Sequence, residues 1–203
     1  MYKKPVIVFE GIEGSGKSYH IKNVTNYLKQ KKIKFIKLRE PGGSLNSEKI
    51  RKLILSKKSN FDKMTDFLLY MSSRNENLNN ILLKNYKKKI ILIDRFLDST
   101  IAYQHYGMGV NLEFIKYINN FILKDFKINF TFLNTVNKKN LKIRLKKRRS
   151  LNRYDKFNYN FYSKVQNGFL KLAKNKNRYL IINSNLPIKH NKEIIINKLK
   201  GLI

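Results

Sequence analysis

Short runs of β-branched and aromatic residues alternate along this 203-residue chain with longer stretches in which apolar residues recur at helical spacing. Side chains repeat with a period of about two in a strand and about 3.6 in a helix, so the two kinds of segment can be told apart. Their alternation is typical of an α/β fold, in which helices cover both faces of a parallel sheet. Five strands are predicted, at residues 6–10, 35–39, 90–94, 130–134 and 179–183.

Five stretches carry a one-sided apolar stripe and are predicted to be helices, at residues 19–30, 47–55, 63 to about 85, 137–149 and 163–174. The stripes are expected to face the core. No internal repeat and no Pro/Gly/Ser-rich linker is visible, so residues 1–203 are predicted to form a single domain. The stripe residues of the first three helices are Ile21, Val24, Leu28, Ile50, Leu53, Ile54, Phe67, Leu68, Met71, Leu78, Ile81 and Leu82.

Composition narrows the class of protein. With 42% hydrophobic residues in 24.2 kDa, the chain can bury the core of one α/β domain. The absence of cysteine excludes disulfides, thiolate metal ligands and cysteine nucleophiles. No apolar run approaches the roughly 20 residues that span a bilayer, and a strand is predicted where a signal peptide would lie. We therefore expect a soluble, cytoplasmic protein with no membrane partner.

The formal net charge is +31, from 44 Lys and Arg residues against 13 Asp and Glu residues. A charge of this size attracts any polyanion at low salt, which makes a nucleic-acid-binding protein an alternative. The excess is mostly lysine scattered along the whole chain. We interpret it as a solvated background that favours anionic ligands in general, and no specific nucleic-acid partner is expected.

Candidate chemistry begins at residues 11–18, GIEGSGKS, directly after the first strand and before the first helix. Backbone N–H groups can crowd around a polyphosphate only where side chains are absent, as they are at the glycines. A helix that starts nearby adds its unpaired N–H groups and the positive end of its dipole. Lys17 is expected to bridge the β- and γ-phosphates and the Ser18 hydroxyl to hold Mg²⁺. The predicted ATP-binding residues are Gly11, Ile12, Glu13, Gly14, Ser15, Gly16, Lys17, Ser18 and Tyr19.

Two further polar clusters follow the second and third strands. The first is REPGG at residues 39–43, where Arg39 can fork onto a phosphate. The second begins with Asp94 and Arg95; Asp94 is expected to approach the Mg²⁺ ion, and Arg95 to direct its charge at the same cavity. Because ligands bind beyond the carboxyl ends of parallel strands, the three clusters are expected to meet at one edge of the sheet.

With these clusters in place, the chain resembles the thymidylate kinase family. Four segments carry the resemblance in the right order: FEGIEGSGKS, REPGG, YMSSR ending at Arg74, and DRFLDSTIAYQ at residues 94–104. The resemblance implies a P-loop nucleoside monophosphate kinase fold, transfer of the γ-phosphoryl group of ATP to dTMP for dTTP synthesis, an Mg²⁺ cofactor and a homodimer. Two alternatives stay open: another P-loop nucleoside or nucleoside monophosphate kinase and, less favoured, a nucleic-acid-binding NTPase.

The resemblance also implies roles for single side chains. Glu13 matches an acid that contacts the acceptor's sugar and helps to organise the site, and Tyr103 matches a residue that crowds the sugar 2′ position. Tyr70 matches an aromatic residue that stacks on thymine and is usually Phe in the family. Positions that contact the base are matched by Arg74, Thr100 and Gln104, and arginines that neutralise the acceptor phosphate by Arg39, Arg51 and Arg95.

A basic lid is implied at about residues 144–158. Some thymidylate kinases carry a catalytic arginine at the position of Gly14, so this chain resembles the bacterial-type subclass, in which the lid supplies it. Arg153 matches the arginine of the lid motif Asp-Arg-x-Glu and is the first candidate, with Arg148 the second. The chain reads NRYD at residues 152–155, which lacks the first acid of the motif and puts the anchoring of the lid in question. The predicted catalytic residues are Lys17, Arg95, Arg153, Arg148 and Glu13.

Overall fold

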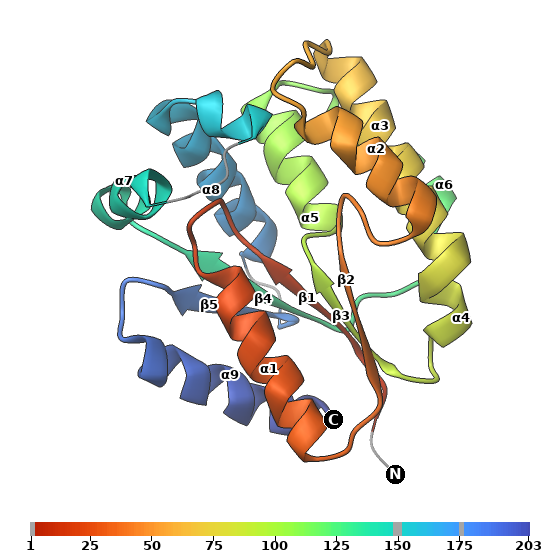
Figure 1. The fold of residues 1–203 in the computed structure, drawn as a ribbon, viewed down its shortest axis with the longest axis vertical. Coiled ribbons are helices and arrows are strands. Elements are labelled where there is room, and N and C mark those ends of the chain that lie inside the picture. The colour runs from red at the N-terminus through yellow and green to blue at the C-terminus, as the bar shows by residue number, and fades with distance from the viewer. Residues whose placement is uncertain (1–2, 148–151, 175–176) are drawn as a thin grey trace.

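The computed structural model describes residues 3–147, 152–174 and 177–203 of the chain. Within them, five strands form one parallel sheet in the order β2-β3-β1-β4-β5 (Figure 1). The predicted α/β fold class is confirmed. The strands are β1 Val6–Glu10, β2 Phe35–Arg39, β3 Ile90–Asp94, β4 Phe130–Thr135 and β5 Tyr179–Asn183. All have the predicted bounds except β4, which extends one residue further.

Helices cover both faces of the sheet (Figure 1). On one face, α1 (Lys17–Gln30) and α9 (Ile188–Leu202) lie side by side and bury Val24, Leu28 and Leu199. On the other face, a π-helical segment, η1 (Leu78–Leu82), and α6 (Leu112–Leu123) contribute Leu82 and Leu123 to a second core cluster. The strands β1 and β3 are buried on both sides, which explains their continuous apolar sequence.

The stretch predicted as one helix over residues 63–85 is divided into α3 (Lys63–Asn77), η1 and α4 (Leu83–Asn85). The wider π turn of η1 shifts the face that the following residues present. α2 (Leu45–Leu55) packs against α3 beyond the sheet. Two predicted core positions are wrong, because Leu53 is 53% exposed and Leu68 is 45% exposed.

Two of the longer helices, α6 and α9, lie outside the predicted stretches, as do the short helical elements at residues 97–107. Both mix isoleucine with asparagine, residues of middling helix propensity, so local sequence alone indicates them weakly. The remaining helical elements are α5 (Leu97–Thr100), the π-helical η2 (Ile101–Gly107), α7 (Lys138–Lys146), the 3₁₀ turn η3 (Arg153–Lys156) and α8 (Tyr159–Ala173). None of the helices in the described ranges is long and apolar enough to cross a membrane.

Strand register brings the polar clusters together. Asp94 of β3 is paired with Arg39 of β2 on one side and with Phe9 of β1 on the other. Glu10, the last residue of β1, is paired with Leu133 of β4. The carboxyl ends of the three strands β1, β2 and β3 therefore open at one edge, next to the place where the strand order reverses direction, and this is where α/β sheets form ligand crevices.

Candidate functional site

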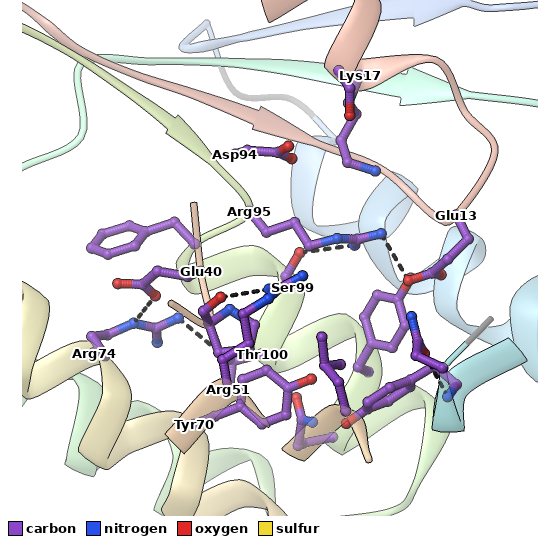
Figure 2. Close-up of a pocket in the computed structure, with 18 of the residues that line it drawn as sticks. Glu13, Lys17, Glu40, Arg51, Tyr70, Arg74, Asp94, Arg95, Ser99 and Thr100 are labelled. Carbon is purple, nitrogen blue, oxygen red and sulfur yellow. Dashed lines mark hydrogen bonds and ion pairs between the residues drawn. The ribbon is translucent and has the colours of Figure 1, made fainter. Parts of the chain in front are cut away.

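A cavity of about 280 Å³ opens at the carboxyl edge of β1 and β3 (Figure 2). The walls come from the loop after β1, the turn after β2, α2, α3, the segment from the end of β3 into η2, and the region of η3. The lining residues are Glu13, Gly14, Lys17, Ser18, Glu40, Pro41, Arg51, Leu55, Tyr70, Arg74, Asp94, Arg95, Phe96, Ser99, Thr100, Tyr103, Gln104, Asn152 and Tyr154.

The loop between β1 and α1 has the backbone that a phosphate-binding loop requires. Gly11, Gly14 and Gly16 have φ values of 134°, 68° and 88°, in a region that other residues rarely adopt. A Cβ atom at Gly11 would lie 2.2 Å from the carbonyl oxygen of Asn134, so close packing also demands glycine there. α1 begins at Lys17 with no acidic residue in its first turn. Its N-terminal N–H groups and dipole are therefore available to an anion.

Lys17 is buried and folds back onto this loop. Its Nζ donates to the carbonyl oxygens of Gly11, at 2.8 Å, and Ile12, at 2.9 Å. Burial, followed by the charge of Arg95, lowers the pKa of Lys17 to about 8. The lysine thus keeps most of its charge at neutral pH and lies ready to exchange two carbonyl contacts for phosphate oxygens.

Oxygen donors for a cation gather next to Lys17. Ser18 and Asp94 both line the cavity, and the carboxylate of Asp94 points toward the Lys17 side of it (Figure 2). Mg²⁺ prefers oxygen ligands and usually takes only one or two from the protein, with phosphates and water completing the shell. No group of three or more His, Cys, Asp or Glu side chains that could enclose a metal is found among the described residues. The Ser18 and Asp94 pair fits an Mg²⁺ ion that arrives with a nucleotide.

Arg95 and Glu13 occupy the centre of the cavity. Arg95 Nη2 donates to Glu13 Oε1 at 3.0 Å, and the Tyr103 hydroxyl donates to the other Glu13 oxygen. Burial acts to raise the pKa of Glu13, but Arg95 and Lys17 outweigh it, so this pKa is lowered. Burial acts to lower the pKa of Arg95, but the Glu13 carboxylate, followed by Tyr103 and the other nearby acids, more than reverses this effect. Both groups are therefore charged at neutral pH.

The backbone of Arg95 is held in a left-handed conformation, with a φ of 65°. Glu10 lies beneath this turn, where Oε1 accepts from the N–H groups of Phe96, at 2.8 Å, and Ser99, at 3.1 Å, and Oε2 accepts from the Ser99 hydroxyl at 2.5 Å. Positive φ is unfavourable for arginine, so the turn needs such contacts to persist. Burial and then the nearby Asp98 raise the pKa of Glu10 to about 7.

Arg74 is 1% exposed, and each of its three nitrogens already donates to a protein acceptor. Nε donates to Glu40 at 2.9 Å, Nη1 to Asn119 and Nη2 to the Thr100 hydroxyl at 3.0 Å. The guanidinium also lies 4.8 Å from the centre of the Phe96 ring. Arg74 thus ties the turn after β2 to α3, α5 and α6 in addition to lining the cavity (Figure 2).

Gln104 differs from Arg74 because its polar atoms have no protein partner. It lies on η2, is 1% exposed and lines the cavity, yet neither its amide nitrogen nor its amide oxygen makes a hydrogen bond. An unpaired buried polar group costs about 1–3 kcal/mol. Two tyrosine rings, Tyr70 and Tyr103, line the same cavity, and burial raises the pKa of both so that their hydroxyls stay neutral. The cavity therefore offers flat apolar rings and one unsatisfied amide.

The two remaining arginines predicted to bind phosphate have different surroundings. Arg51 of α2 lines the cavity, and its Nη1 donates to the carbonyl oxygen of Pro41 at 2.5 Å. Arg39 forms an ion pair with Glu48 at 3.0 Å, its side chain is 55% exposed, and it is not among the lining residues. Of the three arginines predicted to bind the acceptor phosphate, Arg51 and Arg95 thus line the cavity and Arg39 does not.

The lid arginines also differ from one another. Arg153 is not among the lining residues, because its guanidinium donates to the buried carboxylate of Asp66 on α3. Arg148 lies outside the described residues. Arg144 of α7 reaches the phosphate loop, where its Nη1 donates to the carbonyl oxygen of Gly14 at 3.0 Å. A catalytic role for Arg153 requires that it leave Asp66, and this role stays a prediction.

Comparison with known proteins shows the family of the chain. The family model for thymidylate kinase matches residues 9–195. The chain belongs to the thymidylate kinase family. A thymidylate kinase of Sulfurihydrogenibium sp. (strain YO3AOP1) is 38% identical over 198 residues, covering 96% of each chain, and one of Clostridium novyi is 36% identical over 208 residues, covering 100% of each. The crystal structure of thymidylate kinase from Ehrlichia chaffeensis superposes with a TM-score of 0.78 at 30% identity and covers 97% of this chain and 98% of its own.

Family membership confirms the predicted P-loop kinase fold and the predicted activity, the ATP-dependent phosphorylation of dTMP. It favours this activity over the two alternatives. Most of the predicted thymidylate kinase residues meet at the cavity, while five of the predicted ATP-binding residues form the phosphate loop or the start of α1 without lining it: Gly11, Ile12, Ser15, Gly16 and Tyr19. The predicted residues that line it are Glu13, Gly14, Lys17, Ser18, Arg51, Tyr70, Arg74, Asp94, Arg95, Thr100, Tyr103 and Gln104.

Several residues without a predicted role line this cavity or hold its walls in place, among them Glu10, Asp66, Asn119 and Tyr154. Asn119 could have been found from the sequence, because it interrupts the apolar stripe of α6 at a buried position, and a buried amide needs a hydrogen-bond partner. The position of Glu10, at the carboxyl end of a buried strand, is a weaker indication of a role in the site. For Asp66 we find no signal, since its partners Arg153 and Tyr154 lie 87 and 88 residues away in the sequence.

Proposed function

We propose that the phosphate loop binds ATP, that the cavity binds dTMP, and that the γ-phosphoryl group passes between them at the carboxyl edge of β1 and β3. An oxygen of the dTMP phosphate attacks the γ-phosphorus in line, the bond from this phosphorus to the ADP oxygen breaks, and dTDP and ADP leave. Such a transfer needs little covalent help from the protein. The work of the site is to hold the two phosphates in line and to stabilise the charge that develops.

The unpartnered amide of Gln104 is the observation that carries the proposal for the acceptor. Thymine presents an N–H donor beside carbonyl acceptors, and an amide presents the complementary oxygen and nitrogen. Thr100 also lines the cavity and offers its hydroxyl as a second contact for the base, after the Gln104 amide. The ring of Tyr70 gives a face on which the base stacks, a contact worth about 1–3 kcal/mol. Tyr103 stands next to Glu13, where the sugar would lie, and would crowd a 2′-hydroxyl.

Charge on the transferring phosphates is met by a fixed set of cations. Lys17 leaves the loop carbonyls for the β- and γ-phosphates, and Arg95 and Arg51 neutralise the acceptor phosphate. Glu13 orients Arg95 and meets the acceptor's sugar. Arg39 joins this set if its exposed ion pair with Glu48 opens, and Arg74 contacts the base with the hydrogens that its three protein acceptors leave free.

A lid arginine completes the proposal for catalysis. Arg153 supplies it if the guanidinium is released from Asp66, and Arg148 is the second candidate. Arg144 lies next to the phosphate loop, but its Nη1 donates to the Gly14 carbonyl oxygen and its Nη2 to the Ser184 carbonyl oxygen at 2.6 Å, so it too would have to exchange these partners to reach a nucleotide.

Ser18 and Asp94 are the proposed protein contacts of Mg²⁺. When bound, the ion neutralises charge on the phosphate oxygens of ATP. The oxygen donors present and the small number of them fit this cation, as described above. We also propose a cytoplasmic location, because ATP and deoxynucleotides are the proposed substrates.

A homodimer is proposed from apolar side chains that no part of the described chain covers. Leu68 of α3 is 45% exposed, and Tyr117 and Phe121 of α6 are 66% and 69% exposed. The two helices pack together on one side of the molecule (Figure 1), so these side chains lie on neighbouring helices. Exposed apolar surface of this kind marks contact sites between proteins. Light scattering at micromolar concentration is expected to give a dimer, and a charged residue at Phe121 to give a monomer.

The acceptor is tested by giving the purified protein ATP and Mg²⁺ with dTMP, AMP, GMP, CMP or thymidine in turn and measuring the release of ADP. We expect dTMP to be the best acceptor. Equal turnover of the other monophosphates would contradict the assignment of the cavity, and faster turnover of thymidine would indicate a nucleoside kinase.

A further inference from the structure

The side chain of Asp66 joins two elements that the sequence keeps far apart. It lies in the first turn of α3 and is 1% exposed. Its Oδ2 accepts from the Tyr154 hydroxyl at 2.7 Å, and its Oδ1 accepts from the guanidinium of Arg153. Both donors belong to η3, so a single buried carboxylate attaches this turn to α3 by two hydrogen bonds.

The turn held in this way carries one wall of the acceptor cavity. Tyr154 lines the cavity and is 3% exposed, and its ring stands edge-on to Tyr70, with centroids 6.4 Å apart, and to Tyr103, at 5.9 Å. Its carbonyl oxygen accepts from the Tyr162 hydroxyl of α8 at 2.9 Å. Because its own hydroxyl is committed to Asp66, Tyr154 presents only its ring to a bound ligand.

We propose that Asp66 is a positioning residue for dTMP binding, which acts by holding η3 so that the Tyr154 ring completes an aromatic enclosure with Tyr70 and Tyr103. The proposal rests on the assignment of this cavity to dTMP. It answers how the turn is anchored in a chain whose NRYD segment lacks the first acid of the lid motif. The anchoring carboxylate comes from α3, and the guanidinium of Arg153 serves as its counter-ion.

The arrangement predicts which kinetic constant depends on Asp66. Tyr154 faces the nucleoside part of the cavity, whereas ATP is bound by the phosphate loop at the other end. Loosening of η3 should therefore raise the KM for dTMP and leave the KM for ATP and kcat nearly unchanged. A general loss of folded protein would instead lower kcat, since fewer molecules would be active, without a change in either KM.

The first test is Asp66→Asn, which keeps the size of the side chain but removes its charge and one of its two acceptors. We expect the KM for dTMP to rise about tenfold, as for the loss of a charge-assisted hydrogen bond, with kcat within about twofold. Asp62→Asn is the matched control. Asp62 caps the same helix and contacts only Met64 and Thr65, and asparagine caps equally well, so its constants should not change. Isothermal titration with dTMP gives the same comparison without turnover.

The second test is a double-mutant cycle with Tyr154→Ala, which removes the wall itself. If Asp66 acts through Tyr154, Asp66→Asn should change the KM for dTMP less than twofold in the Tyr154→Ala background. Tyr154→Phe, which deletes only the hydroxyl, covers the case in which Asp66→Asn folds poorly, and about a threefold rise in KM is expected for it.

Two results would overturn the proposal. One is a full tenfold effect of Asp66→Asn in the Tyr154→Ala background, because Asp66 would then act elsewhere. The other is a rise in kcat with an unchanged KM for dTMP, because Asp66 would then restrain a catalytic Arg153. Failure of the proposed function itself would look different, since the unmodified protein would then neither bind nor phosphorylate dTMP.

Discussion

The phosphate loop and the cavity, for which we propose ATP and dTMP as ligands, are built in different ways. The loop is one continuous segment that uses backbone N–H groups, three glycines with positive φ and a single lysine. The cavity is made of side chains from elements spread between β1 and η3, tied together by buried ion pairs and hydrogen bonds. A change in the loop should therefore alter chemistry and spare the fold, whereas a change in the cavity should alter both.

Lys17→Ala is the largest expected effect on chemistry. Removal of a charge from the transferring phosphate should lower kcat by about 10³-fold, or ~4 kcal/mol. The free energy of unfolding should change by less than about 1 kcal/mol, because the buried lysine has been desolvated for only two carbonyl contacts. Steady-state kinetics and urea unfolding measure the two quantities, with Lys29→Ala at the other end of α1 as the control. A large loss of stability would break the comparison.

Arg74→Ala should show the opposite behaviour. The substitution leaves Glu40 buried without its partner, which should lower the free energy of unfolding by about 3 kcal/mol. Burial already raises the pKa of Glu40, and Arg74 acts to lower it. In the variant this pKa rises further, so the loss of stability should be smaller at pH 5 than at pH 8, because a larger share of the buried carboxyl is protonated and neutral at the lower pH.

Arg39→Ala is the matched control for Arg74→Ala, because the ion pair of Arg39 with Glu48 is exposed. Such pairs contribute about 0–1 kcal/mol. Urea unfolding of the two variants at both pH values makes the comparison. Equal losses for the two arginines would mean that Arg74 is not a structural tie.

Gln104→Leu should separate binding from stability inside the cavity. Loss of the amide should lower kcat/KM for dTMP by about 10–100-fold, the effect of about 1–3 kcal/mol of lost hydrogen bonding. The free protein should become more stable by about 1 kcal/mol, because an unsatisfied buried amide is replaced by an apolar group. Thermal unfolding without ligand measures the change in stability, and kinetics with dTMP measure the change in kcat/KM. A variant that is both less stable and fully active would show that the amide has no role in binding.

The smallest expected effect is a pH dependence in the loop. Lys17 is charged below its lowered pKa of about 8 and neutral above it, so affinity for ATP should fall as the pH rises through 8. At pH 9 the dissociation constant should be up to about tenfold higher than at pH 7. Titration calorimetry across this range measures it. Lys17→Arg keeps its charge and should show no such inflection, while an inflection that persists in it would assign the effect to another group.

The sequence predicted the strands well because each is a short run of β-branched and aromatic residues, and the runs of β1, β3 and β4 are almost fully buried. It predicted the phosphate loop for a similar reason, since every group that the loop uses lies within eight consecutive residues. The core positions of α2 and α3 were predicted less well. Leu53 and Leu68 belong to regular apolar stripes, yet they are exposed, and only the packing of the two helices against each other decides which side of a stripe is covered.

The candidate site shows the same division. The sequence motifs predicted most of the residues that line the cavity, but not the protein groups to which these residues are hydrogen-bonded. Arg74 was predicted to contact the base and is bound by Glu40, Asn119 and Thr100, and Arg153 was predicted to be catalytic and is bound by Asp66. Such pairings depend on distances between elements that are remote in the sequence, so no local pattern reports them.

The amino-acid sequence by itself thus determined the kind of sheet, the phosphate loop and the family, because these follow from the order of neighbouring residues and from backbone chemistry. Tertiary structure alone decided which charged side chains are free to meet a ligand and which are already paired. The physical reason is that a charge taken out of water must find a partner at close range, and its nearest partner in space is set by the packing of the whole chain.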